Sequence, residues 1–182
     1  MPKPDVSRSA ADLTLRVSVQ KTKGGQMKNI LFIVLLLPAI NCFGEDSFRV
    51  VSVHDGDSVT VLTVEKKQIK IRLEGIDAPE LKQAFGSRAK EHLSSLIMGK
   101  DVTLILKGED LYNRTLSKIL LDGQDVNLTM ISDGFAWHYS KYSKDKKFAE
   151  AEAEARTKKK GLWKDQDPVA PWDYRSNQKV KK

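Results

Sequence analysis

The clearest alternation of hydrophobic and polar residues lies at positions 69–74. Ile69, Ile71 and Leu73 fall on one face of an extended chain, while the polar residues between them fall on the other. A period of two predicts a strand with one buried face, and it places Arg72 on the polar side. Similar short apolar runs predict four further strands, at residues 48–53, 59–64, 102–106 and 115–121.

Three stretches have the spacing or composition of helices instead. Residues 85–98 carry apolar side chains at helical spacing and are followed by Gly99. Residues 126–132 precede Gly134, and residues 148–160 precede Gly161. The last of these stretches alternates Ala and Glu, which superficially suggests a strand. Both are strong helix formers, however, and the pairs Glu152–Arg156 and Glu154–Lys158 have the i,i+4 spacing that supports a helix.

Five short strands with helices after the third and the fifth predict an α+β fold. The expected architecture is a five-stranded Greek-key barrel of the OB type, capped by about three helices. The pattern alone does not separate this barrel from other α+β domains. A length of 182 residues is consistent with one domain plus its ends.

The amino-terminal part has a different composition. Residues 1–26 are polar, and after Met27 and Lys28 an apolar run covers residues 30–40, which is too short to span a bilayer. A basic start, a short apolar core and small residues up to Gly44 predict a secretory signal peptide at 27–44. The alternatives are a buried core helix, or a lipoprotein anchor at Cys42, whose preceding residues fit such a signal poorly.

These segments give a domain plan. Residues 1–26 are interpreted as an upstream extension that is either disordered or not translated, and residues 27–44 as the signal peptide. The folded domain is expected at residues 45–165, followed by a polar basic tail at 166–182 that we expect to be mobile. Cleavage after Gly44 would leave no cysteine, so the domain would hold together by core packing without disulfides.

The charge is compatible with nucleic-acid binding but does not establish it. The whole chain has 31 Lys and Arg against 24 Asp and Glu, a formal net charge of +7. Residues 1–44 contain six of the basic and two of the acidic residues, so the remainder carries only +3. A domain this mildly basic is identified as a nucleic-acid binder only from its motifs.

Three short motifs carry the candidate chemistry. After the strand at 69–73, Gly75 and Pro79 favour a fixed loop that presents Asp77 and Glu80 close to Arg72. Asp57 lies in a second motif, the Asp-Gly turn between the first two predicted strands, and Arg114 ends a third at residues 111–114. Taken alone, the second motif is a hairpin turn, the third is a polar turn, and Glu80 is a surface residue. Arg72 taken alone could pair with Glu74.

In this order and spacing the motifs resemble those of the staphylococcal nuclease family. The family pattern is Asp-Gly-Asp-Thr, then Arg-Leu-x-x-x-Asp-(Thr/Ala)-Pro-Glu, then Tyr-Gly-Arg, and the resemblance extends from about residue 48 to residue 163. The departures are Ser58 for Thr and Asn113 for Gly, with Ala78 at the Thr/Ala position. None of them removes a charged group, and Asn tolerates a left-handed turn. The resemblance implies the same OB-type fold.

The resemblance also implies roles for individual residues. Asp57, Asp77 and the backbone carbonyl of Ala78 would bind Ca²⁺, and a hard oxygen set without His or Cys favours that ion over zinc or copper. Glu80 would act as general base or orient the attacking water, and Arg72 and Arg114 would bind the scissile phosphate. Tyr112 and one of Tyr139 or Tyr142 resemble substrate-contacting tyrosines of the family, and the register leaves open which of the last two it is.

The predicted function is a calcium-dependent endonuclease, periplasmic or secreted, that hydrolyses DNA and RNA with little sequence preference. By resemblance its products would carry 3′-phosphates and 5′-hydroxyls. We expect a monomer without stable membrane association once the signal peptide is removed. The alternatives are a non-catalytic nucleic-acid- or protein-binding module, since OB barrels also serve as binding domains, and an unrelated barrel. The complete set of two Asp, one Glu and two Arg favours the enzyme.

Overall fold

The computed structural model describes residues 47–110 and 112–180. The predicted upstream extension at 1–26, the signal peptide at 27–44 and Cys42 all lie outside the described residues. Within the described ranges, no helix is both long enough and apolar enough to cross a membrane.

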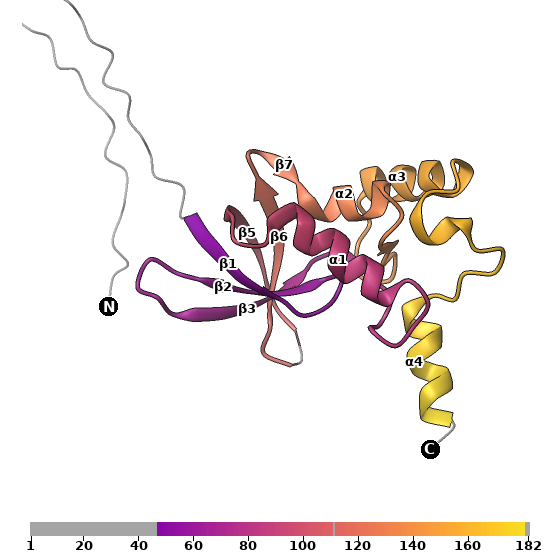
Figure 1. Cartoon of the computed structure of the whole chain (residues 1–182), viewed down its shortest axis with the longest axis horizontal. Coiled ribbons are helices and arrows are strands. Elements are labelled where there is room, and N and C mark those ends of the chain that lie inside the picture. The colour runs from indigo at the N-terminus through magenta and orange to yellow at the C-terminus, as the bar shows by residue number, and fades with distance from the viewer. Residues whose placement is uncertain (1–46, 111, 181–182) are drawn as a thin grey trace, which may run out of the picture. The chain divides into compact units, whose positions relative to one another are not determined.

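Five strands form a closed barrel (Figure 1). The sheet order is β3-β2-β1-β5-β6, and β3 also pairs in parallel with β6, which closes the barrel. The two-residue strand β7 (Gln124–Asp125) extends the sheet beside β6. The α+β class and the OB-type barrel predicted from the sequence are thereby confirmed. The five barrel strands are β1 (Ser47–Val53), β2 (Ser58–Leu62), β3 (Gln68–Leu73), β5 (Asp101–Glu109) and β6 (Thr115–Leu121).

The barrel interior is filled by the apolar face of each strand. Ile71 and Leu73 of β3 are 1% exposed, as their alternation with polar neighbours predicts. Helix α1 (Gly86–Ile97) covers the barrel with Ala89, Leu93 and Ile97, which follow one another at four-residue intervals and are fully buried.

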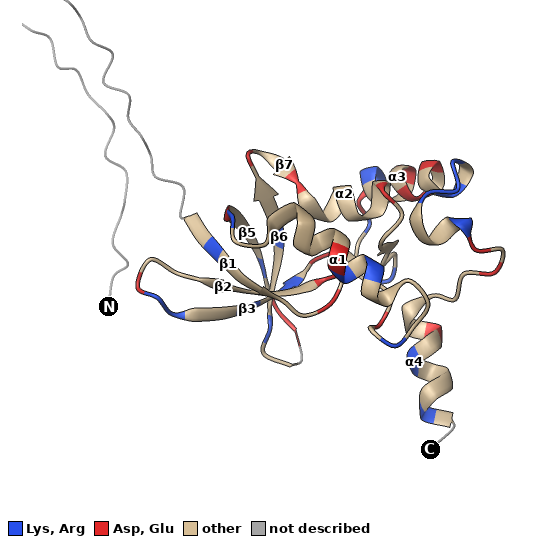
Figure 2. Ribbon diagram, viewed as in Figure 1, with Lys and Arg blue, Asp and Glu red and all other residues tan. Residues whose placement is uncertain are grey.

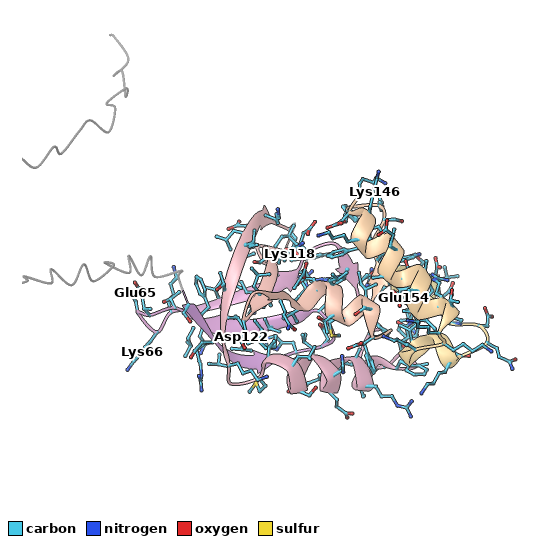
Figure 3. The ribbon with its side chains drawn as sticks, turned by 90° about the horizontal axis from the view of Figure 1, so that it is seen from above. Glu65, Lys66, Lys118, Asp122, Lys146 and Glu154 are labelled. Atoms are coloured by element: carbon cyan, nitrogen blue, oxygen red, sulfur yellow. The ribbon has the colours of Figure 1, made fainter. Side chains whose placement is uncertain are left out.

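Two further helices pack together after the barrel strands. Helix α2 (Val126–Ser132) is capped by Asp125, whose Oδ1 accepts a hydrogen bond from the Leu128 amide at 3.0 Å. Helix α3 (Lys146–Thr157) is capped in the same way by Asp145, and its predicted Glu152–Arg156 pair forms at 2.7 Å. Figure 3 labels Lys146 and Glu154 on α3, at the opposite end of that view from the β2–β3 turn at Glu65.

The carboxy-terminal segment differs from the expectation of a mobile tail. After the 3₁₀ turn η1 (Gly161–Lys164), residues Pro171–Val180 form helix α4, a fourth helix where about three were predicted. Trp172 of α4 meets Trp137 edge to face, with ring centroids 5.6 Å apart. Trp137 in turn contacts Trp163 at 4.4 Å. This aromatic cluster gives the polar segment an apolar surface on which to fold.

Candidate active site

Asp57 and Arg72 are brought together by the register of the β2–β3 hairpin. Ser58 at the start of β2 pairs with Arg72 near the end of β3, and the Leu73 amide donates to the Asp57 carbonyl at 2.8 Å. Arg72 therefore lies beside the carboxylate of Asp57, and its Nη2 is 3.0 Å from Oδ2.

Asp77 reaches the same point through a sharp turn after β3. Gly75 has φ 75°, a left-handed conformation that glycine adopts without strain. The chain then enters the short strand β4 (Ile76–Asp77), which pairs with β8 (Trp137–His138), so that Asp77 lies opposite Trp137. The Asp77 side chain is only 1% exposed, and its Oδ1 accepts a hydrogen bond from Arg72 Nη2 at 2.9 Å.

Both terminal nitrogens of the Arg72 guanidinium have fixed contacts. Its Nη1 donates to the carbonyls of Leu73 and Ile76 at 3.0 Å each, while Nη2 bridges the two aspartates. The structure therefore pairs Arg72 with Asp57 and Asp77, and not with Glu74 as the alternative interpretation would have it. A planar group with this many fixed contacts has a defined orientation.

Asp57 is a buried carboxyl, 6% exposed. The Ala78 amide donates to its Oδ2 at 2.7 Å, and the Ser58 hydroxyl to its Oδ1 at 3.2 Å. Burial raises the pKa of Asp57 to about 7, against the lowering influence of Arg72, and the charges of Asp55 and Asp77 raise it further. Any additional positive charge nearby would strongly stabilise the ionised form of a carboxyl in such a position.

Arg114 lies at the same end of the barrel because β6 runs parallel to β3. Thr115 pairs with Ile71 across that closing contact, and Arg114 immediately precedes it. Its Nη1 is 3.4 Å from the Ser58 hydroxyl, and its Nε donates to Asp110 at 2.7 Å. Asn113, which replaces the glycine of the family pattern, has φ 55°, so it adopts the left-handed turn anticipated for it.

Glu80 follows in the loop between β4 and α1. Its side chain is 40% exposed, and its backbone amide donates to Gln83 Oε1 at 3.2 Å. Gly86 fixes this loop closely, because a Cβ at that position would lie 1.9 Å from the Glu80 carbonyl oxygen. Glu80 is thus more open to solvent than either aspartate.

The three candidate tyrosines lie in two places. Tyr139 and Tyr142 follow β8, with ring centroids 4.7 Å apart, and the Tyr139 amide donates to the Gly75 carbonyl at 2.9 Å. Burial raises the pKa of Tyr139, and the charge of Asp77 adds to this effect. Tyr112 is 79% exposed and lies under the Arg114 guanidinium, 5.7 Å from its ring centroid. Tyr139 thus contacts the turn that leads to Asp77, and Tyr112 contacts Arg114, so both places border the cluster formed by Asp57, Arg72 and Asp77.

Sequence reasoning missed one residue that contacts this cluster. Arg175 of α4 donates from Nη2 to Asp77 Oδ2 at 2.7 Å and from Nη1 to Glu80 Oε1 at 2.8 Å. Figure 2 shows α4, with basic residues along it, beside the loop that leads into α1. The available signal was the pair Trp172 and Arg175, which share one face of a helix at i,i+3 within an otherwise polar segment.

The cluster offers oxygen ligands to a cation. In the described ranges, no group of three or more His, Cys, Asp or Glu side chains gathers as a cation site. Asp57 and Asp77 share the Arg72 guanidinium, so two buried carboxylates do meet at one point. Completed by backbone oxygen and water, such a set fits a hard divalent cation.

Known proteins resemble this chain over most of its length. The model of the family described as staphylococcal nuclease homologue matches residues 70–165. An uncharacterized endonuclease of Haemophilus influenzae is 42% identical over 155 residues, which cover 85% of this chain and 86% of that protein. A micrococcal nuclease of Shigella flexneri is 37% identical over 153 residues, covering 78% and 87% of the two chains. The chain therefore belongs to the staphylococcal nuclease family.

Proposed function

We propose that this nuclease is a calcium-dependent endonuclease that hydrolyses DNA and RNA with little sequence preference, leaving 3′-phosphates and 5′-hydroxyls. The observation that carries the proposal is the buried cluster of Asp57, Arg72 and Asp77, in which one guanidinium contacts two carboxylates. Arg114 and Glu80 lie at its margins. A structural role alone would not require two aspartates to be buried with their charges so close together.

Asp57 and Asp77 are the residues that would hold the cation, with the backbone carbonyl of Ala78. The raised pKa of Asp57 supports this assignment, because a nearby divalent cation would keep that carboxyl ionised. Ca²⁺ accepts irregular sets of carboxylate, carbonyl and water oxygens, which suits a site with only two carboxylates. When bound, the cation would supply positive charge beside the phosphate oxygens.

The two arginines would bind the scissile phosphate. Arg72 is already oriented by the Leu73 and Ile76 carbonyls, which accept from its Nη1. The N–H groups that would donate to phosphate oxygens are those of Nε and of Nη2, and Nη2 is shared with Asp57 and Asp77 in this structure. Arg114 is oriented by Asp110, which accepts a hydrogen bond from its Nε. Glu80 is exposed enough to meet water, and its carboxylate would accept the proton of the attacking molecule. Tyr112, Tyr139 and Tyr142 would contact the nucleotides on either side.

Export is part of the proposal. The apolar run at 30–40 supports removal of residues 27–44 and release of the chain to the periplasm or the medium, without stable membrane association. We expect the released chain to be a monomer. The folded domain would then begin near Glu45 and retain the carboxy-terminal segment to residue 182.

A pair of variants tests the assignment of ligand and base. Asp77→Asn replaces a charged ligand oxygen by a neutral amide, so it should raise the Ca²⁺ concentration needed for half-maximal activity. Glu80→Gln keeps shape and an acceptor oxygen but takes no proton at neutral pH. It should lower the rate at saturating Ca²⁺ by about 10²–10⁴-fold, with a smaller change in calcium affinity.

The measurements are calcium titrations of activity and calorimetric titration of calcium binding. Full activity of Glu80→Gln at saturating Ca²⁺ would show that Glu80 is not the base. Nucleic-acid binding by the unmodified chain without any cleavage would instead favour the non-catalytic binding module.

A further inference from the structure

Helix α4 places the positive charge of Arg175 against Asp77, a proposed cation ligand, and Glu80, the proposed base. Arg175 Nη1 and Nη2 lie 3.2 Å and 2.7 Å from the two carboxylate oxygens of Asp77. Nη1 also donates to Glu80 at 2.8 Å. Asp77 is almost wholly buried, so Arg72 contacts it from the barrel side while Arg175 contacts it from a more exposed side.

A second contact of α4 involves a candidate substrate residue. Trp172 stacks on Tyr139, with ring centroids 5.3 Å apart and planes inclined by 4°. Trp172 and Arg175 are three residues apart and share one face of the helix. The same face of α4 therefore covers both Tyr139 and the carboxylates of Asp77 and Glu80.

Besides the contacts of Trp172 and Arg175, two hydrogen bonds attach α4 and the residue Val169 that precedes it. Gln83 Nε2 donates to the Val169 carbonyl at 2.6 Å, and the Tyr174 hydroxyl donates to the Lys82 carbonyl at 3.3 Å. Gln83 and Lys82 both belong to the loop that carries Glu80. Within α4 itself, Pro171 is the one buried residue among those described. The contacts of α4 all come from its first half, and residues 176–180 are exposed. A terminal helix attached in this way can detach without unfolding the domain.

Arg175 and a cation would compete for the same oxygens. Each carboxylate oxygen of Asp77 accepts a hydrogen bond from Arg175, so its lone pairs are partly used. Two positive groups at one carboxylate also repel each other. An intact Arg175–Glu80 pair in addition occupies Oε1 of Glu80, one of the two oxygens of the carboxylate proposed to accept a proton from water.

We propose that Arg175 is a positioning residue of the active site which holds Asp77 and Glu80 in the cation-free enzyme, and that a bound cation displaces it together with α4. This inference rests on the proposed function, because it takes Asp77 to be a cation ligand. In the cation-free state α4 acts as a strap over Tyr139 and the carboxylates. Displacement of Arg175 uncovers the tyrosine and frees Glu80 at the same time.

Calcium affinity of the exported chain, measured by calorimetry without substrate, is the first test. Arg175→Gln removes the competing charge and should bind Ca²⁺ about five- to tenfold more tightly than the unmodified chain. Lys179→Gln is the matched control, because it removes the same charge from the same helix one turn farther on. It should bind Ca²⁺ as the unmodified chain does.

Equal or weaker affinity in Arg175→Gln would overturn the proposal, as would an equal gain in Lys179→Gln. Equal Ca²⁺ affinity in the unmodified chain and both variants would overturn the proposed competition between Arg175 and Ca²⁺, but the proposed calcium site would stand. Absence of binding in all three would overturn both.

Hydrogen exchange of the unmodified chain provides a second test that needs no variant. The amides of α4 should exchange faster with saturating Ca²⁺ than with chelator, while those of the barrel strands should not. Unchanged or slower exchange in α4 would overturn the proposal.

Discussion

Replacing Asp57 by Asn tests the electrostatics of the buried cluster through its effect on folding. The pKa of Asp57 is raised by burial from 3.8 to about 7 in the folded chain. The folded state therefore retains a proton that the unfolded state releases as the pH rises above about 4. Because the folded pKa is the higher one, this group stabilises the fold at low pH, and that contribution is lost as the pH rises through about 7.

The size of the effect follows from the same two values. A difference of about three pH units corresponds to about 4 kcal/mol of unfolding free energy, at about 1.4 kcal/mol for each unit. The amide that Asp57→Asn introduces takes no proton. The unfolding free energy of the variant, relative to that of the unmodified chain, should therefore rise by up to about 4 kcal/mol as the pH goes from 4 to 8.

Urea unfolding at several pH values, with chelator present throughout, measures this difference. Asp122→Asn is the matched control, because Asp122 (labelled in Figure 3) is an exposed turn residue with φ 50°, a conformation that Asn also accepts. Its stability difference should not vary with pH. A stability difference for Asp57→Asn that is equally constant from pH 4 to pH 8 would show that the pKa of Asp57 is not raised in the folded chain.

Three further predictions address the remaining parts of the site and the export of the chain. Arg72→Lys and Arg114→Lys keep the charge but lose the planar fork, so each should lower turnover about a hundredfold or more, about 3 kcal/mol; steady-state rates near normal would assign that arginine a purely structural role. Gly86→Ala would place a Cβ 1.9 Å from the Glu80 carbonyl oxygen, so it should lower both turnover and melting temperature, and an unchanged rate and melt would contradict the close contact. Amino-terminal sequencing of exported protein should begin near Glu45, whereas a start at residue 1 or 27 would exclude the predicted cleavage.

The barrel could be predicted because each strand carries its own period-two signal. Burial of Ile71 and Leu73 and of the α1 residues Ala89 and Leu93 follows directly from their spacing. The ends of elements were less accurate. The third predicted helix begins at Lys146, two residues early, because Asp145 caps it, and it ends at Thr157. Caps of this kind depend on one side chain and leave little periodic signal.

Helix α4 was not predicted because its stability comes from tertiary contacts. Its polar sequence gives little amphipathic signal, and Trp172 is ordered by Trp137 and Tyr139 from another part of the chain. For the same reason nothing local to Arg175 indicated its pairing with Asp77, 98 residues away.

Within the site, sequence reasoning identified the charged residues but not all of their partners. Strand alternation places Arg72 and Glu74 on one face, which left a pair between them as the alternative for Arg72 taken alone. The turn at Gly75 instead returns the chain so that Asp77 meets Arg72. The meeting of Asp57 with both depends on the β2–β3 register, which alternation alone leaves open because a shift by two residues keeps every side chain on the same face.

The proposed calcium dependence of the cluster around Asp57 and Asp77 can be tested on the reaction itself. The most direct measurement is the rate of hydrolysis of single-stranded DNA and of RNA by the chain beginning at Glu45, with Ca²⁺ and then with excess chelator. We expect cleavage of both substrates with Ca²⁺, loss of cleavage in chelator, and recovery when Ca²⁺ is restored. Undiminished cleavage in chelator, or no cleavage of either substrate with Ca²⁺, would contradict this expectation.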